Sequence, residues 1–283
     1  MYAIEDIYPK YACPDCEGSG DEDRPVFRQA PAVKYLIPKS IATYELLAYT
    51  MTNKFCEHLP FYRQEKAFER RCITVTRADM SNWQEQIYKR LKPMDKLIMN
   101  HIKSGNTMNM DETTVKVLKY KNQRNNDSRK KSYIWLGIGG PKDNKAVIYR
   151  YYESRHHKYI KPFINGFKGY LQTDEYPGYE TAINEDEFHE WLLEIKPKVP
   201  PTLMFGRAIN YALSAWNHLL NYLDCSELFV DNSIAERSIK PFVIGRKNWL
   251  FSGSETGAES SCFLFTLIEN AKLYKLDPYE YLL

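Results

Sequence analysis

The spacing of apolar residues changes at Gly105, and this change constrains the fold more than any other feature of the 283-residue chain. Before Gly105, apolar residues recur at helical intervals in three segments, 40–58 after a candidate N-cap at Ser40, 61–71 after Pro60, and 77–103 with a bend at Pro93. After it, apolar residues alternate with polar ones in short runs rich in Thr, Val, Ile and Tyr. The sequence therefore predicts a helical region followed by an α/β domain.

The order of elements after Gly105 narrows the fold class. Three successive strands are predicted at 107–120, 132–140 and 145–154, then a helix at 155–167 and a further strand at 169–179. From Phe188 the pattern indicates separate helices, with 252–260 (SGSETGAES) as a turn. Three antiparallel strands, a helix and another strand form the beginning of a ribonuclease-H-like sheet, so we predict a mixed sheet of that type.

Composition excludes some classes of protein and leaves others open. The chain is 43% hydrophobic and 27% charged, as in ordinary globular proteins, and no run of 18 uncharged apolar residues predicts a membrane span. The start, MYAIEDIYPK, lacks the pattern of a signal peptide, which predicts a cytoplasmic protein. The net charge of +3 does not by itself indicate a nucleic-acid-binding protein.

Three acidic residues stand where such a sheet would use them. Asp111 lies on the first predicted strand, Asp174 ends the fourth, and Glu236 in DNSIAERSIKP belongs to a late helix. Phosphodiester cleavage requires a deprotonated nucleophile and a stabilised leaving oxygen, which two Mg²⁺ ions on carboxylate ligands provide. Any single acid is more often solvated than catalytic, so three dispersed acids are weak evidence when taken alone.

Several segments resemble the insertion sequence 66 family of transposases. These are residues 30–83, MDETTVKVL at 110–118, GYLQTDEYPGY at 169–179, and the run from Phe229 to Leu282. The resemblance implies a DDE-type DNA transposase of ribonuclease-H-like fold. It would cleave and transfer strands with Mg²⁺ bound by Asp111, Asp174 and Glu236, and would act on element-end and target DNA as a homo-oligomer.

The resemblance and the patterns together divide the chain into three parts. Residues 1–33 are predicted to be a cysteine-containing knuckle or tail, 34–104 a helical DNA-binding region, and 105–283 the catalytic domain with its C-terminal helices. In the knuckle, Cys13 and Cys16 resemble half of a zinc-binding element. Because four ligands are needed and no upstream pair is present, an unmetallated knuckle is favoured over a closed zinc site with Cys56 and His58.

Candidate DNA contacts fall in three places. The helices at 61–71 and 77–91 have nearly helix-turn-helix proportions, so Arg77, Ser81 and Asn82 could reach DNA, although a bundle packed on the domain is an equal alternative. The basic segment 119–131 predicts a phosphate-contacting hairpin tip, and basic residues also surround Glu236, where a solvated basic face is the alternative. The residues predicted in these two groups are Arg129, Lys130, Lys131, Arg237, Lys240, Arg246 and Lys247.

The helix that carries Glu236 needs an N-terminal cap. Asp231 or Asn232 is predicted to provide it, and Asn232 and Glu236 then share one face of the helix.

The chain also departs from the family pattern. After YPGYETAINEDEF, a buried strand and a long helical insertion typical of the family are missing, and the start looks clipped. Losing that strand would leave Asp174 at a sheet edge, and metal geometry tolerates little error. We therefore predict weak Mg²⁺ binding and poor catalysis, with a DNA-binding remnant as the alternative function; another ribonuclease-H-like nuclease is disfavoured by the specific C-terminal match.

Overall fold

The structure is a computed structural model. It describes residues 5, 7–12, 27–31, 35–38, 40–118, 131–155, 159, 163–173, 185–216, 225, 227–228 and 232–283. By its internal packing the chain divides into two units, Met1–Tyr44 and Glu45–Leu283.

The N-terminal unit contains a pair of short antiparallel strands, β1 (Lys10–Ala12) and β2 (Phe27–Gln29). Their register runs from Lys10 opposite Gln29 to Ala12 opposite Phe27. The sequence predicted only loop and knuckle here, because three-residue strands are too short to show an alternating pattern. The predicted zinc residues Cys13 and Cys16 lie outside the described residues.

Four helices precede the sheet: α1 (Tyr44–Phe55), α2 (Phe61–Glu69), α3 (Arg77–Leu91) and α4 (Pro93–Lys103). The predicted helices are confirmed, but the first begins at Tyr44, because Ser40 does not cap it and its hydroxyl accepts a hydrogen bond from the Ala42 amide at 3.1 Å. The predicted bend at Pro93 is a break between two helices. Proline lacks the amide that would continue α3, and it is well suited to the first turn of α4.

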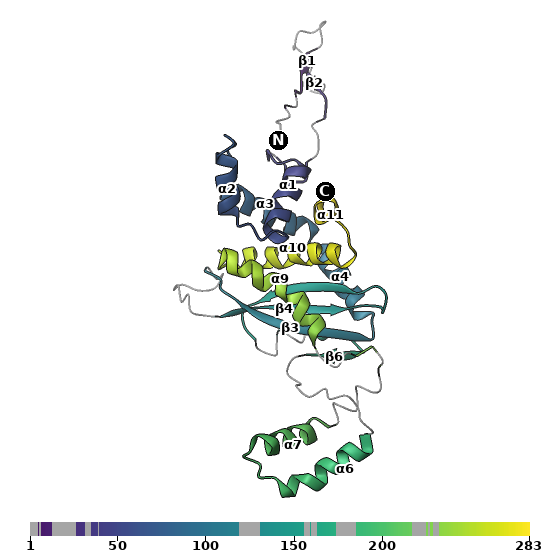
Figure 1. Ribbon diagram of the computed structural model, residues 1–283. Helices are drawn as coiled ribbons and strands as arrows, with labels where there is room; N and C mark the ends of the chain where they lie inside the picture. Colours follow the sequence, from purple (N-terminus) through teal and green to yellow (C-terminus); the bar gives the residue numbers. More distant parts are fainter. Residues whose placement is uncertain are drawn as a thin grey trace. The chain divides into compact units, whose positions relative to one another are not determined.

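The second unit is built around a four-stranded mixed sheet (Figure 1). Its strands are β3 (Thr107–Val115), β4 (Ser132–Gly139), β5 (Ala146–Tyr152) and β6 (Tyr170–Gln172), in the spatial order β5-β4-β3-β6. β4 is antiparallel to both β3 and β5, and β6 is parallel to β3. The predicted α/β class and mixed sheet are therefore confirmed.

The transition from helix to strand at Gly105 depends on a close backbone contact. A Cβ atom at Gly105 would lie 2.1 Å from the carbonyl oxygen of Gly140, so only glycine fits there. The change in periodicity at this residue thus marks a real structural boundary. The helices on both sides of it nevertheless belong to the same compact unit.

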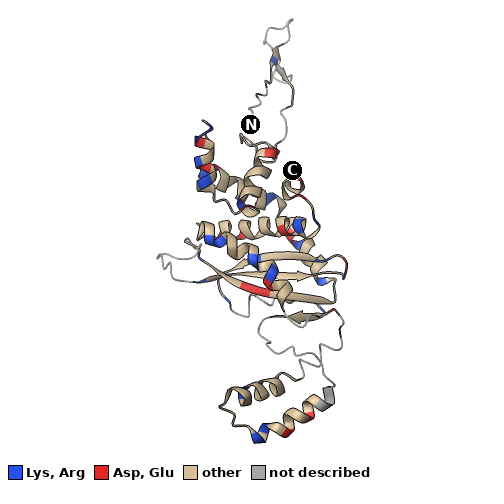
Figure 2. Ribbon diagram, viewed as in Figure 1, with Lys and Arg blue, Asp and Glu red and all other residues tan. Residues whose placement is uncertain are grey.

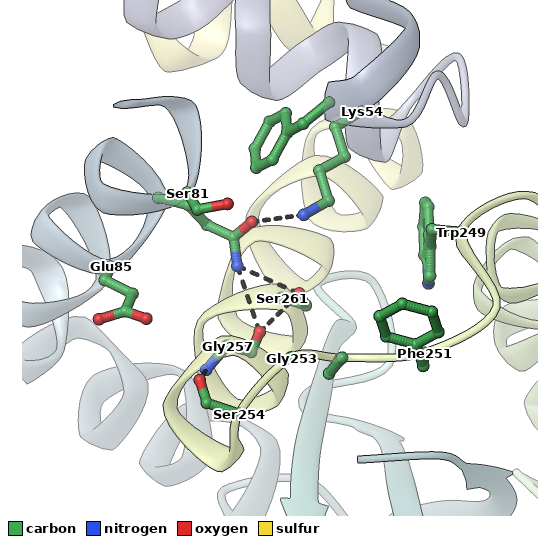
Figure 3. Close-up of a pocket in the computed structure, with 12 residues that line it drawn as sticks. Lys54, Ser81, Glu85, Trp249, Phe251, Gly253, Ser254, Gly257 and Ser261 are labelled. Carbon is green, nitrogen blue, oxygen red and sulfur yellow. Dashed lines mark hydrogen bonds between the residues drawn. The ribbon is translucent and has the colours of Figure 1, made fainter. Parts of the chain in front are cut away.

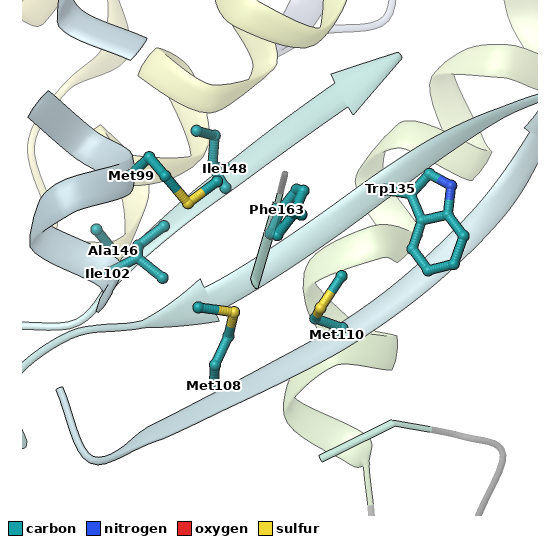
Figure 4. Packing of buried hydrophobic residues seen from close by; sticks show 8 residues of the cluster. All are labelled: Met99, Ile102, Met108, Met110, Trp135, Ala146, Ile148 and Phe163. Atoms are coloured by element: carbon teal, nitrogen blue, oxygen red, sulfur yellow. The ribbon is translucent and has the colours of Figure 1, made fainter. Parts of the chain in front are cut away.

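Helices cover both faces of the sheet. On one face, α4 packs on β4 and β5 over a buried cluster that Figure 4 shows from close by, with Met99, Ile102, Met108, Met110 and Ile148 among its members. On the other face lie α9 (Ser233–Trp249) and α10 (Glu255–Leu273). There the Tyr149 ring contacts Phe242 of α9 and Phe265 of α10, with centroids 6.4 and 5.8 Å apart.

The helix α10 corrects one prediction. Residues 252–260 were predicted to form a turn, but α10 begins at Glu255, and the hydroxyl of its N-cap Ser254 accepts a hydrogen bond from the Gly257 amide at 3.0 Å. The Ser-Gly-Thr composition that suggested a turn is also the composition of a capped first helical turn.

The same helix covers the outer edge of β5. The Asn270 side chain accepts a hydrogen bond from the Val147 amide at 3.0 Å and donates one to its carbonyl at 2.7 Å. The Thr266 hydroxyl accepts a hydrogen bond from the Tyr149 amide at 2.9 Å. Backbone groups that an edge strand would otherwise expose are therefore satisfied by α10 side chains.

The remaining elements are helical, as predicted for the part after Phe188. They are α6 (Glu185–Ile195), η1 (Lys196–Lys198), α7 (Met204–Ser214) and α11 (Pro278–Leu282). In the predicted helix at 155–167, Tyr159, Phe163 and Ile164 are helical, and several of its residues lie outside those described. Within the part of the chain that the structure describes, none of the helices combines the length and hydrophobicity of a membrane span.

Candidate functional site

Asp111 lies in the middle of β3, opposite Leu136 of β4. Its neighbour Met110 is buried on the α4 side of the sheet, so alternation along the strand directs Asp111 to the α9 side. Thr113, two residues further, confirms this direction because its hydroxyl accepts a hydrogen bond from Arg246 of α9. The Asp111 carboxylate is half-buried and accepts a hydrogen bond from the Glu112 amide at 2.6 Å.

A buried pair of amide side chains fixes the neighbouring strand β6. The Asn109 side chain donates a hydrogen bond to the Gln172 side chain at 2.8 Å, and the two residues are paired in the β3–β6 ladder. Asn109 precedes Asp111 by two positions, and Gln172 precedes Asp174 by two positions. Asp174 itself lies outside the described residues.

The first turn of α9 is attached to β3 beside Asp111. Asn232 occupies the N-cap position, as predicted, but its side chain makes no capping hydrogen bond. Instead it donates a hydrogen bond to the Met110 carbonyl at 2.9 Å, because the strand backbone is within its reach and buried. The other predicted cap, Asp231, lies outside the described residues.

Glu236 follows Asn232 by one helical turn. Its side chain is exposed and makes no hydrogen bond or ion pair with the described part of the chain. Since Asn232 is bonded to the residue before Asp111, the two predicted acids lie on elements that meet at this point.

The other end of α9 is attached to β3 as well. Arg246 donates hydrogen bonds to the Thr113 hydroxyl at 3.0 Å and to the Thr114 carbonyl. Burial lowers the pKa of its guanidinium from the ordinary value. Arg246 therefore has a structural role, and its predicted contact with DNA stays a prediction. The other basic residues of this helix, Arg237, Lys240 and Lys247, are exposed, and Figure 2 shows basic stretches of α9 beside the acidic segment of β3.

Comparison with known proteins decides the family. A model described as "Transposase IS66 family" matches residues 39–185 and 180–260, which together make up most of the chain. The chain belongs to this family.

Relatives with curated sequences come from Sinorhizobium fredii (strain NBRC 101917 / NGR234), and all are described as uncharacterized. The protein y4jD is 27% identical over 359 residues, which include 98% of this chain and 67% of y4jD. For y4qI the identity is 25%, with 90% of this chain and 61% of the relative covered, and for y4hP it is 21%, with 99% and 64%. The IS66-family chain thus spans about two thirds of the length of these relatives.

The matches also bear on the predicted internal deletion. The two segments that match the family model meet at residues 180–185, shortly after Asp174. The alignment with y4jD extends over 359 residues, more than the 283 residues of this chain. The split of the family match agrees with a segment that has no counterpart in the IS66-family chain at this point, and the length of the alignment agrees with residues of y4jD that this chain lacks.

The remaining predicted DNA contacts lie on separate surfaces of the IS66-family chain. Arg77 and Asn82 are exposed on α3, and the seven residues between α2 and α3 are more than the three or four of a helix-turn-helix turn. Lys131 is exposed at the start of β4, whereas Arg129 and Lys130 lie outside the described residues. A role of these residues in DNA binding stays a prediction.

The predicted magnesium site stays a prediction. Within the described ranges, no three His, Cys, Asp or Glu side chains lie close enough together to hold a metal ion. Asp174, one of the three predicted magnesium ligands, lies outside those ranges.

Two interactions beside Asp111 were not predicted. Glu112 forms an ion pair of 2.6 Å with Arg155, and Asn109 bonds to Gln172. Arg155 could have been suspected from its place at the end of the third predicted strand, next to the acids. The amide pair could not, because Asn and Gln on a strand normally indicate an exposed face.

Proposed function

We propose that the chain is a DNA transposase that cleaves and joins strands with divalent metal ions held by Asp111, Asp174 and Glu236. The observation that carries the proposal is the buried Asn109–Gln172 pair, which sets the register of β3 and β6 two residues before the first two acids. A parallel register continued for two residues would bring those acids level on one face of the sheet. The attachment of α9 beside Met110 supports Glu236 as the third ligand.

The strand order supports a ribonuclease-H-like fold. The first three strands of the sheet in chain order, β3, β4 and β5, pair antiparallel in succession. The fourth, β6, pairs parallel with the first, β3. This same order of strands in the sequence predicted a ribonuclease-H-like sheet. We infer this fold from topology.

The chemistry of the donors fits magnesium. Three carboxylates offer hard oxygen ligands, and two bound Mg²⁺ ions would activate the attacking oxygen and stabilise the leaving oxygen. Glu112, the next residue on β3, faces the opposite side of the sheet, where it forms an ion pair with Arg155. The exposed cations Arg237, Lys240 and Lys247 would contact the DNA backbone near the third acid.

The test measures cleavage and metal binding on the same variants. With Mn²⁺ or Mg²⁺ and DNA carrying the ends of the encoding element, we expect cleavage that Asp111→Asn reduces by at least about 100-fold, since even indirect ligand partners cost 10–100-fold. Titration calorimetry with Mn²⁺ should show the same loss. The matched control is Asp143→Asn in the exposed turn before β5. Cleavage unchanged by Asp111→Asn would refute the proposed site.

A second candidate function is a catalytically defective DNA-binding protein. It is favoured by the short β6, which forms one side of the described sheet, and by the segment of the relatives that has no counterpart after Asp174. In this case the chain would bind element-end DNA but would not cleave it with either metal. This alternative would be established if the wild type binds element-end DNA without forming cleavage products, and if neutralising basic residues of the chain abolishes that binding.

A further inference from the structure

A cavity whose lining includes Glu85 but neither Asp111 nor Glu236 lies between the N-terminal helices and the start of α10 (Figure 3). Its volume is about 310 Å³, and its walls come from α1, α2, α3, the loop after α9 and the first turns of α10. Sites for organic ligands begin at about 300 Å³, and a cavity of about 150 Å³ already holds one benzene ring. The space is therefore large enough for a nucleobase.

One wall of the cavity is aromatic. Trp249 is held by edge contacts with Phe55 and Phe242, with centroids 6.2 and 6.5 Å apart. Phe251, which also lines the cavity, is 44% exposed. Between them, Leu250 is the C-cap of α9 and has a φ of 66°, a strained conformation for a leucine.

The opposite wall carries hydrogen-bonding groups. The Lys54 ammonium donates to the Gln84 side chain at 2.6 Å and lies 3.9 Å from the centre of the Phe61 ring. Gln84 in turn donates to Ser260 and Ser261 of α10, which fixes its orientation. Figure 3 shows Lys54 lining the same cavity as the Trp249 and Phe251 rings.

The Lys54 ammonium has N–H groups that form no hydrogen bond with the described residues. A lysine ammonium has three N–H groups, and within the described residues one hydrogen bond of Lys54 is formed, to Gln84. Burial lowers its pKa to about 7, because desolvation disfavours the charged form. An oxygen acceptor that enters the cavity would accept a hydrogen bond from an unused N–H group of Lys54. It would also stabilise the charged form of Lys54, which burial disfavours.

We propose that this cavity binds one unpaired nucleotide of the DNA, with the base stacked on Trp249 and Phe251 and an oxygen of the nucleotide bonded to Lys54. The proposal rests on the proposed function, in that the ligand is DNA. Stacking on aromatic rings and a nearby cation are the means by which proteins hold unpaired bases of any sequence.

The fold also predicts where this nucleotide lies. Trp249 is at the last turn of α9 and Glu236 at the first, a separation of roughly 20 Å at about 1.5 Å per residue. At about 3.4 Å per base pair this corresponds to roughly six base pairs of duplex. A duplex that runs along α9 would therefore place the unpaired nucleotide about six base pairs from the reacting phosphate.

The experiment compares two labelled duplexes of the same sequence, one fully paired and one with a single T·T mismatch, in EDTA so that no cleavage occurs. By fluorescence anisotropy, the full chain should bind the mismatched duplex at least about fivefold more tightly. Phe251→Ala should remove this preference. So should Gly253→Leu, which fills the cavity at a position where an added Cβ meets no atom within 4 Å.

The controls separate the pocket from general DNA binding. Both variants should bind the paired duplex within about twofold of wild type, because they change no charge. Phe205→Ala on α7, where Phe205 is 51% exposed, should keep the preference. Equal affinity of wild type for the two duplexes, or a preference retained in Gly253→Leu, overturns the pocket alone. Failure to bind either duplex overturns the pocket together with the proposed function.

Discussion

Asn109 and Gln172 are nearly fully buried polar side chains whose hydrogen bond joins two strands far apart in the chain. A buried amide that loses its partner retains its desolvation cost, whereas two apolar side chains of similar shape have none. The pair therefore makes one register of β6 on β3 more favourable than a shifted one. Specific pairing, more than overall stability, is what these two residues provide.

Replacing one member of this pair should destabilise the protein more than replacing both. Gln172→Met removes the partner of the Asn109 amide, and we expect the free energy of unfolding in urea to fall by about 1–3 kcal/mol. The double variant with Asn109→Leu should recover most of this loss. Asn248→Leu, at an exposed position on α9, is the control and should change stability by about 0.5 kcal/mol or less. A double variant less stable than the single one would contradict the argument.

Single residues differ in how far their roles could be predicted. Asp111 on a strand and Glu236 on a helix were placed from local pattern, and both placements are confirmed. Asn232 was correctly predicted to be the N-cap of α9, but its side chain bonds to the Met110 carbonyl and not to the first turn of the helix. The sequence indicates which residue precedes a helix, but the Met110 carbonyl that competes for its side chain comes from a strand 122 residues away.

At the scale of elements, α10 combines a polar start with an apolar continuation. Ser254, Glu255 and Gly257 form the capped first turn. Every residue from Cys262 to Ile268 is buried, and the helix packs on β5 and α3. The prediction of a turn failed because the propensities of the first turn were weighed without the packing of the following three turns.

The cap of α10 should contribute measurably to stability. Ser254→Ala removes the acceptor of the Gly257 amide, and we expect a loss of about 1 kcal/mol in the free energy of unfolding. Ser254→Asp should retain most of the stability, since aspartate caps helices as well as serine does. Ser214→Ala, at the exposed C-terminal end of α7, serves as the unaffected control. Equal losses in the alanine and aspartate variants would mean that the hydroxyl does not act as a cap.

For the whole molecule, the order of helices and strands could be predicted, but the contacts between distant segments could not. Alternating and helical periodicity are local signals, and they gave the succession of α1 to α4 and β3 to β6. The packing of α3 on α10 joins segments more than 150 residues apart, and the Gln84 bond to Ser260 is one of its contacts. No local pattern reports such a contact, and the cavity between these helices was missed for the same reason.

The distribution of charge gives a prediction at this scale. The net charge of +3 is small, so DNA binding under the proposed function depends on local cations such as Lys240 and Lys247 on α9. Each phosphate contact contributes about 0.9 to the slope of log affinity against log salt concentration, so Lys240→Gln with Lys247→Gln should reduce the slope by about 1.8. The pair Lys196→Gln with Lys198→Gln, also exposed, removes the same charge on η1 and should leave it unchanged. If both double variants show the same slope of log affinity against log salt concentration, the DNA-binding surface does not include α9.

The covering of β5 by α10 has a consequence for assembly. The side chains of Asn270 and Thr266 form hydrogen bonds with the β5 backbone groups that would otherwise pair with a further strand. The helix α10 thus takes the place of a fifth strand at this edge. While α10 is docked, two copies cannot merge into one continuous sheet across β5. A complex that brings two DNA ends together would therefore have to be joined by helices, loops or the β6 side, and the hydrogen-bonded sheet of each copy would remain self-contained at its β5 border.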